Sequence, residues 1–236
     1  MDRYVFNPFT VIALVLFFLL MVVIIPFILL GLIGGALTNL GFSWGEALSL
    51  LVLMLLGSFV NIPVTKLENR QLAVRREYTM FGMFYRIPEF SYQTIVAVNI
   101  GGAVIPVIIS LYLLFLATVQ MGLVVLVSAL VGVALVTLIT NRVARPVPGL
   151  GIATPLLIPP LAALVCGIML AGANPATAPV ARPLIAYISG TLGTLIGADL
   201  LNLRRIGELG APVASIGGAG TFDGIFLTGI IAAFLA

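Results

Sequence analysis

The chain has 236 residues, of which 61% are hydrophobic and only 8% carry a formal charge. About a quarter of the residues in a soluble globular domain are charged, so this composition excludes a soluble protein and equally a charge-rich disordered one. The net charge of +3 comes from basic residues spread over short loops, which is not the pattern of a nucleic-acid-binding surface.

Two absences narrow the possible chemistry. The chain has no histidine and a single cysteine, Cys166. Histidine-dependent acid–base catalysis, histidine-ligated metals and intrachain disulfides are therefore excluded. We expect no metal and no cofactor, and any reaction must use carboxylates, hydroxyls, amides or backbone groups.

In chain order, the apolar segments predict an all-α, polytopic membrane helix bundle. A spanning helix needs ~20 mostly apolar residues. Seven segments approach that length, and together they indicate one integral membrane domain over residues 1–236: 8–34, 44–63, 93–117, 121–140, 150–172, 181–203 and 220–236. Pro26 predicts a tilt or kink in the first, and Ser43 to Glu46 has the spacing of a capping box at the start of the second.

The distribution of basic residues predicts the orientation. Ten of the eleven Lys and Arg residues fall at the N-terminus or in the loops near 64–92, 141–149 and 204–219, which seven spans place on one side. Only Arg182 falls on the other side. The positive-inside rule then predicts a multi-pass protein of the cell membrane, with its N-terminus in the cytoplasm and its C-terminus outside.

The segment 65–92 is the longest polar stretch, and it mixes basic with aromatic residues. That combination suits a cytoplasmic-face segment lying on anionic lipid headgroups, as a connector or with a regulatory or substrate-contact role. The alternation from Tyr78 to Arg86 equally suits a small hairpin that turns at Gly82.

Apart from Glu46 in the predicted capping box, two acids fall inside the predicted spans, where ionisable residues are candidate functional groups. Asp199 lies four residues before the end of span six, and Asp223 three residues after the start of span seven. At ~1.5 Å per residue both lie ~5–6 Å inside the same face, on consecutive antiparallel helices that we expect to pack together. Two carboxyls that close share a proton, as an aspartyl dyad does.

Each acid also has a structural interpretation. Asp223 suits an N-terminal cap, and Asp199 suits a partner for Arg204 or Arg205. The glycines around the acids allow either close helix packing or an unwound stretch that holds an extended peptide. They are Gly197, Gly217, Gly218, Gly220 and Gly224.

Two further spans contain helix-breaking residues. Span three has Asn99 and Pro106, and span five has Pro159-Pro160-Leu161. We expect these breaks either to kink the helices or to line a polar cavity.

The sequence around the acids resembles the GxGD intramembrane aspartyl proteases, the presenilin and signal peptide peptidase group. Gly220-Thr221-Phe222-Asp223-Gly224 is similar to their second aspartate motif, and Asp199-Leu200-Leu201 to their first. Phe222 and Ala198 depart from the usual glycine and tyrosine, and Pro159-Pro160-Leu161 would stand in for the family's Pro-Ala-Leu motif. The whole chain also resembles a family of uncharacterised prokaryotic multi-pass membrane proteins.

The favoured hypothesis is an intramembrane aspartyl protease with Asp199 and Asp223 as its dyad. Its partners would be membrane lipid and a transmembrane peptide or protein substrate, with no nucleic acid, and the sequence indicates no oligomeric state. The alternative is a proton- or cation-coupled transporter or channel that uses the same acids, the broken helices and Asn99. A non-catalytic scaffold is a third possibility.

Overall fold

The computed structural model describes residues 8–68, 78–80, 83–85, 93–147, 151–172, 177–207, 213–218 and 223–236. These residues are mostly helical, as the sequence predicts. The α-helices are α1 (Pro8–Asn39), α2 (Trp44–Gly57), α3 (Ile105–Met121), α4 (Leu123–Val143), α5 (Ile158–Leu170), α6 (Ala178–Thr194), α7 (Leu203–Gly207) and α8 (Gly224–Leu235).

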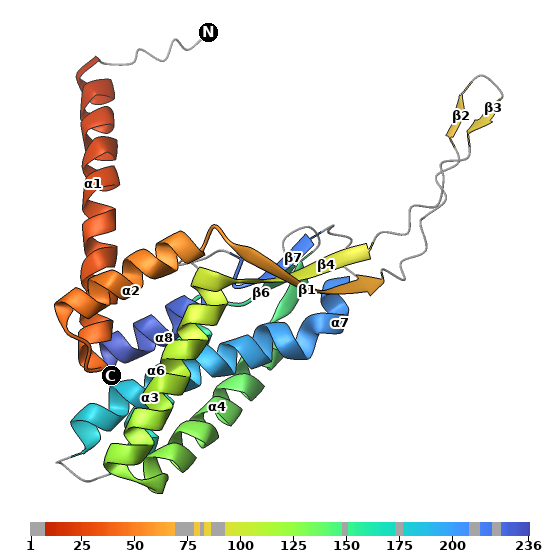
Figure 1. Cartoon of the computed structure of the whole chain (residues 1–236). Coiled ribbons are helices and arrows are strands. Elements are labelled where there is room, and N and C mark those ends of the chain that lie inside the picture. Colours follow the sequence, from red (N-terminus) through yellow and green to blue (C-terminus); the bar gives the residue numbers. More distant parts are fainter. Residues whose placement is uncertain are drawn as a thin grey trace.

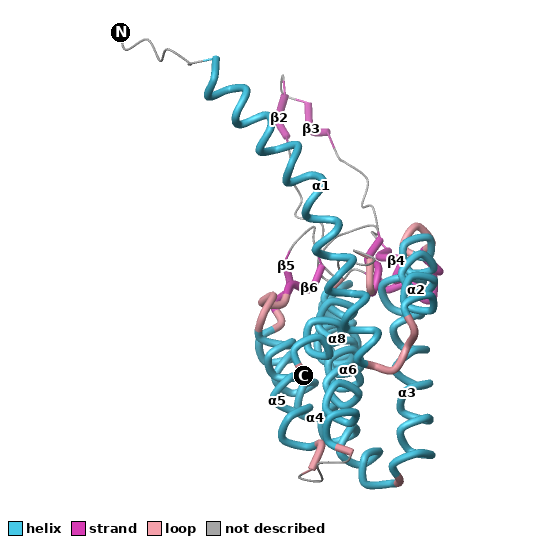
Figure 2. Tube along the Cα trace, turned by 90° about the vertical axis from the view of Figure 1, so that its left-hand side faces the viewer, coloured by secondary structure: helices cyan, strands magenta, loops and turns pink. Residues whose placement is uncertain are grey.

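Helix α6 forms the centre of the bundle. Helices α3, α4, α5 and α8 all pack against it (Figure 1). Its middle is closed to solvent, since Ile185, Tyr187 and Ile188 are fully buried. Helix α1 contacts the bundle mainly through its C-terminal part, and its N-terminal part projects away from the other helices (Figures 1 and 2).

A three-stranded sheet lies at one end of the bundle (Figure 1). Its strands are β1 (Asn61–Glu68), β4 (Gln93–Asn99) and β7 (Val213–Ile216), in the order β1-β4-β7. Strand β4 is antiparallel to β1 and parallel to β7. Because β7 precedes α8 and β4 leads into α3, the sheet marks the end of the bundle where α8 begins.

All seven predicted apolar segments contain a helix, but the helices differ in length from the prediction. Four are long and apolar enough to cross a membrane: Val11–Asn39, Ile100–Met121, Leu123–Val143 and Ala178–Ile206. The helices Trp44–Gly57, Ile158–Leu170 and Gly224–Leu235 are apolar but shorter. The structure thus supports a membrane protein with at least four candidate spans.

Three predicted span boundaries are wrong because hydropathy does not distinguish a strand from a helix. Residues 93–99, predicted to begin span three, form strand β4. Span two was expected to reach residue 63, but α2 ends at Gly57 and β1 follows. Span five was expected from residue 150, yet strand β6 (Gly151–Ala153) comes first and pairs with β5 (Arg145–Val147).

The prolines of spans three and five, expected either to kink a helix or to line a polar cavity, lie in the first turns of helices, and Pro159 also lines a pocket. Pro106 is in the first turn of α3, and Pro159 and Pro160 are in the first turn of α5. Proline is well suited to that position, because the first amides of a helix have no intrahelical partner. Only Pro26 and Pro183 lie inside helices of the described chain.

The hairpin predicted within segment 65–92 is present. Strands β2 (Tyr78–Met80) and β3 (Met83–Tyr85) are antiparallel, with Met80 opposite Met83. Gly82 and most of this segment lie outside the described residues.

Candidate functional site

Asp199 lies at a break in helix geometry after α6. Residues Leu195–Asp199 form a π-helical turn, η2, and Leu200–Asn202 continue as a 3₁₀ turn, η3. Single π turns inside α-helices occur frequently at functional sites, and they leave some carbonyls to find other partners. The Asp199 side chain is partly buried.

Asp223 occupies the N-cap of α8. Its backbone is extended, and its Oδ1 accepts a hydrogen bond from the Ile225 amide at 3.0 Å. Asp223 therefore forms the N-terminal cap that its position in the sequence suggested. Capping engages Oδ1 on the helix side and does not exclude chemistry at the carboxyl, which is only partly buried.

The fold brings the two acids together. Helices α6 and α8 pack against each other, and Asp199 lies at the end of one where Asp223 begins the other. The Asp223 carboxylate acts electrostatically on Asp199. Arg205, one expected partner of Asp199, instead donates to Asn202 Oδ1 at 3.1 Å.

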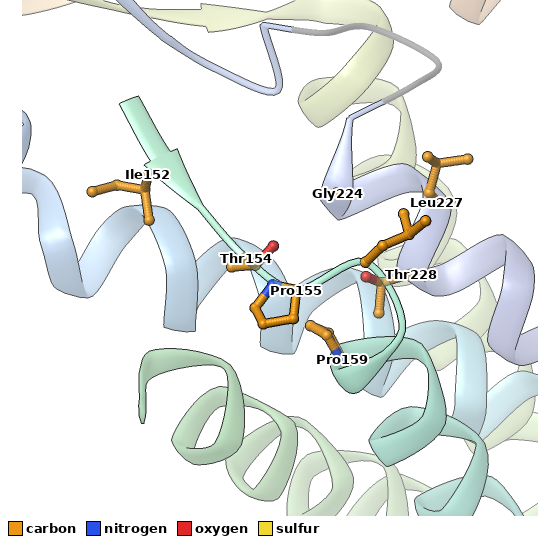
Figure 3. A pocket seen from close by; sticks show the side chains of 8 residues that line it. Ile152, Thr154, Pro155, Pro159, Gly224, Leu227 and Thr228 are labelled. Carbon is orange, nitrogen blue, oxygen red and sulfur yellow. The ribbon is translucent and has the colours of Figure 1, made fainter. Parts of the chain in front are cut away.

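A pocket of about 240 Å³ opens beside Gly224, the residue that follows Asp223 in the chain (Figure 3). Strand β6, which contributes to the pocket wall, also lies against η2, so the pocket adjoins the segment that carries Asp199. The pocket is smaller than the ~300–1,000 Å³ typical of small-molecule sites. It is lined by Ile152, Thr154, Pro155, Leu156, Pro159, Gly224, Leu227 and Thr228.

The predicted glycines have distinct roles. A Cβ on Gly197 would lie 2.5 Å from the Thr137 carbonyl oxygen, so its absence lets α4 approach η2. Gly217 has φ +72° and packs against Ala103, and a Cβ on Gly218 would lie 2.8 Å from Ser215. A Cβ on Gly224 would meet only Thr154 Oγ1 at 3.6 Å, because this glycine borders the pocket. Gly220 and Thr221 lie outside the described residues.

Of the remaining predicted site residues, Pro159 lies at the pocket and Asn99 lies at the start of the helical segment that contains α3. Pro159 lines the pocket, Pro160 is buried beside it in the sequence, and Leu161 is about half exposed. Asn99 is fully buried and caps the π turn η1 (Ile100–Val104) by accepting from the Gly102 amide. Its Nδ2 donates to Ser58 O at 2.8 Å and Asn61 Oδ1 at 3.0 Å, so Asn99 joins η1 to the start of β1.

Several polar residues near the acids were not identified as site residues from the sequence. Thr154 and Thr228 line the pocket, and Asn141 and Asn202 donate to the backbone of η2. Asn202 follows Asp199 by three residues in a predicted span, which was an available signal. Asn141 was assigned to a loop, and only the packing of α4 on η2 brings it close.

A second polar feature extends from Asp199 into the bundle. Helix α6 carries Tyr187, Thr191 and Thr194, and helix α4 carries Thr137 and Thr140. In the part of the chain that the structure describes, the hydroxyl oxygens of all five are buried; those of Thr137, Thr140 and Thr194 have no hydrogen-bond partner there, and those of Tyr187 and Thr191 have only each other. Such a concentration on two packed helices is unusual, because an unpaired buried hydroxyl costs about 1–3 kcal/mol.

Among the described residues, no three His, Cys, Asp or Glu side chains gather where they could hold a metal ion. The fold and the site thus define a helical membrane protein with two interacting carboxyls at one end of its bundle. The chain belongs to the DUF1614 family, whose description is protein of unknown function and whose profile matches residues 55–235. Both acids lie within the match, and α1 lies outside it. No curated protein and no solved structure matches the chain.

Proposed function

We propose that this protein is an intramembrane aspartyl protease that cleaves membrane-embedded peptides with the Asp199/Asp223 pair. The observation that carries the proposal is that two acids 24 positions apart lie at the same end of adjacent antiparallel helices that pack against each other. Like-charged carboxyls in such a position share a proton, which supplies one general base and one general acid. The resemblance to GxGD proteases leads to the same two residues.

The reaction needs no group beyond these carboxyls and water. The ionised carboxyl takes a proton from water while the water oxygen bonds to the peptide carbonyl carbon. The protonated carboxyl gives its proton to the carbonyl oxygen. The carboxyl that took the water proton then gives it to the leaving nitrogen as the C–N bond of the tetrahedral diol breaks. The other carboxylate takes a proton from a diol hydroxyl, whose oxygen becomes the carbonyl of the acid product, and both acids are back in their starting state.

The surroundings of the acids suit an extended peptide. Strand β7 is an edge of its sheet within the described chain, and it leads through Gly217 towards Asp223. An edge strand can pair with a substrate backbone. The pocket beside Gly224 has the size for one side chain, with apolar walls and the hydroxyls of Thr154 and Thr228 (Figure 3).

This proposal includes the seven-span arrangement with a cytoplasmic N-terminus in the cell membrane. The site would then act near the cytoplasmic face, because most basic residues lie at that end of the spans. Alternate-side labelling of single cysteines in a Cys166→Ala background tests the orientation.

A transition-state probe tests the activity without knowledge of the natural substrate. We expect the purified full chain to be labelled by a photoreactive peptide that carries a hydroxyethylene isostere, because such analogues bind ~10²–10⁸-fold tighter than substrates. Asp199→Asn and Asp223→Asn should abolish labelling and also cleavage of a panel of transmembrane peptides. Glu46→Gln is the matched control, since Glu46 is an exposed acid at the start of α2. Retention of labelling or cleavage by either Asp variant would contradict the proposal.

A proton-coupled transporter is the second candidate, and the five buried hydroxyls of α4 and α6 favour it. Hydroxyls that extend from a membrane carboxyl into the bundle are suited to bind water and relay protons. Proteoliposomes with an internal pH dye would then show proton flux that Thr191→Val slows. Flux no greater than in empty liposomes would exclude this candidate.

A further inference from the structure

We infer that Asn141 and Asn202 are positioning residues that hold the η2 turn and thereby direct Asp199 towards Asp223. The inference rests on the proposed function only for the catalytic role of Asp199. The orientation of residue 199 is inferred separately, from the hydrogen bonds that η2 makes.

The backbone of η2 needs partners from outside the helix. A π turn pairs residues five apart and the following 3₁₀ turn pairs residues three apart, so carbonyls at their junction lose regular helical partners. Gly197 and Ala198, which stand just before this junction, are buried. Unpaired carbonyls there would be costly in a membrane, where no water replaces the lost hydrogen bond.

Two asparagine amides meet this need from different elements. The Gly197 carbonyl accepts from Asn141 Nδ2 on α4 and from Asn202 Nδ2 on η3, each at 3.0 Å. The Ala198 carbonyl accepts from Asn202 Nδ2 at 2.9 Å. Together these donors engage the two residues directly before Asp199.

Arg205 orients one of the two amides. Its guanidinium donates to Asn202 Oδ1 at 3.1 Å, which fixes the oxygen towards the arginine and the nitrogen towards the η2 carbonyls. The Asn202 side chain is 2% exposed, so this arrangement is enclosed by protein. The missing side chain of Gly197 provides the close approach that Asn141 requires.

The consequence concerns the direction of Asp199. A π turn holds one more residue than the corresponding α-helical turn, so its loss would rotate the following residues by about 100° around the helix. Such a rotation would turn Asp199 away from Asp223. The asparagines therefore act on catalysis through the backbone, without touching the substrate.

Cross-linking measures this direction without any activity. In a Cys166→Ala background, Asp199→Cys and Asp223→Cys are joined with a short bis-methanethiosulfonate reagent, and the linked product is quantified by mass spectrometry. We expect efficient linkage with Asn141 present, about tenfold slower linkage in Asn141→Leu, and retention in Asn141→Gln, which keeps the amide donor. Asn141→Ala removes the donor without adding bulk and provides a second test if the leucine variant does not fold.

The inference would be overturned if the double-cysteine protein with Asn141 intact failed to link, or if it linked no faster than its Asn141→Leu and Asn141→Ala variants.

In the otherwise native chain, Asn141→Leu should lower kcat for a cleaved peptide about 10–100-fold and leave KM nearly unchanged, because the pocket residues stay in place. A change confined to KM would contradict a positioning role. If linkage follows the asparagine but Asp199→Asn still cleaves, the positioning stands and the proposed protease fails.

Discussion

Helices α1 and α6 are both long and apolar, yet they have opposite places in the molecule. Most side chains of α1 from Val11 to Ile28 are exposed, whereas Ile185, Tyr187 and Ile188 of α6 are fully buried. Helix α1 is also the more hydrophobic of the two. In a membrane, apolar surface gives no preference for protein over lipid, so small and polar residues decide which helix becomes the core.

The two acids, Asp199 in the turn after α6 and Asp223 at the start of α8, give the largest expected effect. If Asp199 and Asp223 share one proton, activity should have a bell-shaped pH dependence. Below the optimum both carboxyls are protonated and no base remains; above it both are ionised and no acid remains. We expect activity to fall about tenfold per pH unit on each flank, measured as kcat/KM with a cleaved peptide. A profile with a single acidic flank would mean that only one carboxyl acts.

Glycine substitutions test the packing difference directly. A Cβ on Gly229 of α8 would overlap Thr191 Oγ1 on α6 and lie 3.0 Å from the Tyr187 ring, whereas a Cβ on Gly31 of α1 meets nothing within 4 Å. Gly229→Ala should therefore destabilise the protein by about 1–3 kcal/mol. Gly31→Ala should be neutral or stabilising by up to ~1 kcal/mol, because alanine is the better helix former. Unfolding in mixed detergent measures both, and equal effects would contradict the described packing.

The pocket gives a smaller, substrate-dependent effect. Leu227 lines the pocket, while Leu235 near the end of the same helix is exposed. Leu227→Trp should raise KM about tenfold for peptides with a large side chain at the cleavage site, and less for those with alanine. Leu235→Trp is the control and should leave both constants unchanged. An equal KM change for all peptides would show that the pocket does not bind this side chain.

The α2 cap gives the smallest effect. Ser43 Oγ accepts from the Glu46 amide at 3.3 Å, and Glu46 Oε2 accepts from the Ser43 amide at 2.8 Å, which completes the predicted capping box. Ser43→Ala should lower stability by about 1 kcal/mol. Ser49→Ala in the same helix removes only an exposed bond to Gly45 O and should have less effect. The reverse order would mean that the cap does not hold α2.

Sequence reasoning succeeded for features encoded locally. The Ser43–Glu46 capping box, the apolar character of seven helices and the hairpin near Gly82 all follow from neighbouring residues. It failed for strand β4, because Gln93–Asn99 is as apolar as a helix start and forms a strand only through pairing with β1 and β7. It left open whether Pro106 and Pro159 kink a helix or line a cavity, since hydropathy does not show where a helix begins. Pro159 lies in the first turn of α5 and lines the pocket.

Composition and local pattern alone determined that this chain belongs in a membrane, that histidine chemistry and intrachain disulfides are excluded, and that Asp199 and Asp223 are the acids to examine. The tertiary structure decided which apolar helix forms the core, where the pocket lies and which amides hold η2. An apolar composition indicates that the chain is surrounded by lipid. The pocket and the Asn141 contact instead depend on residues far apart in sequence, which meet only when α4, α6 and α8 pack. The physical cause is close approach at glycines such as Gly197, which depends on the facing helix as much as on the glycine itself.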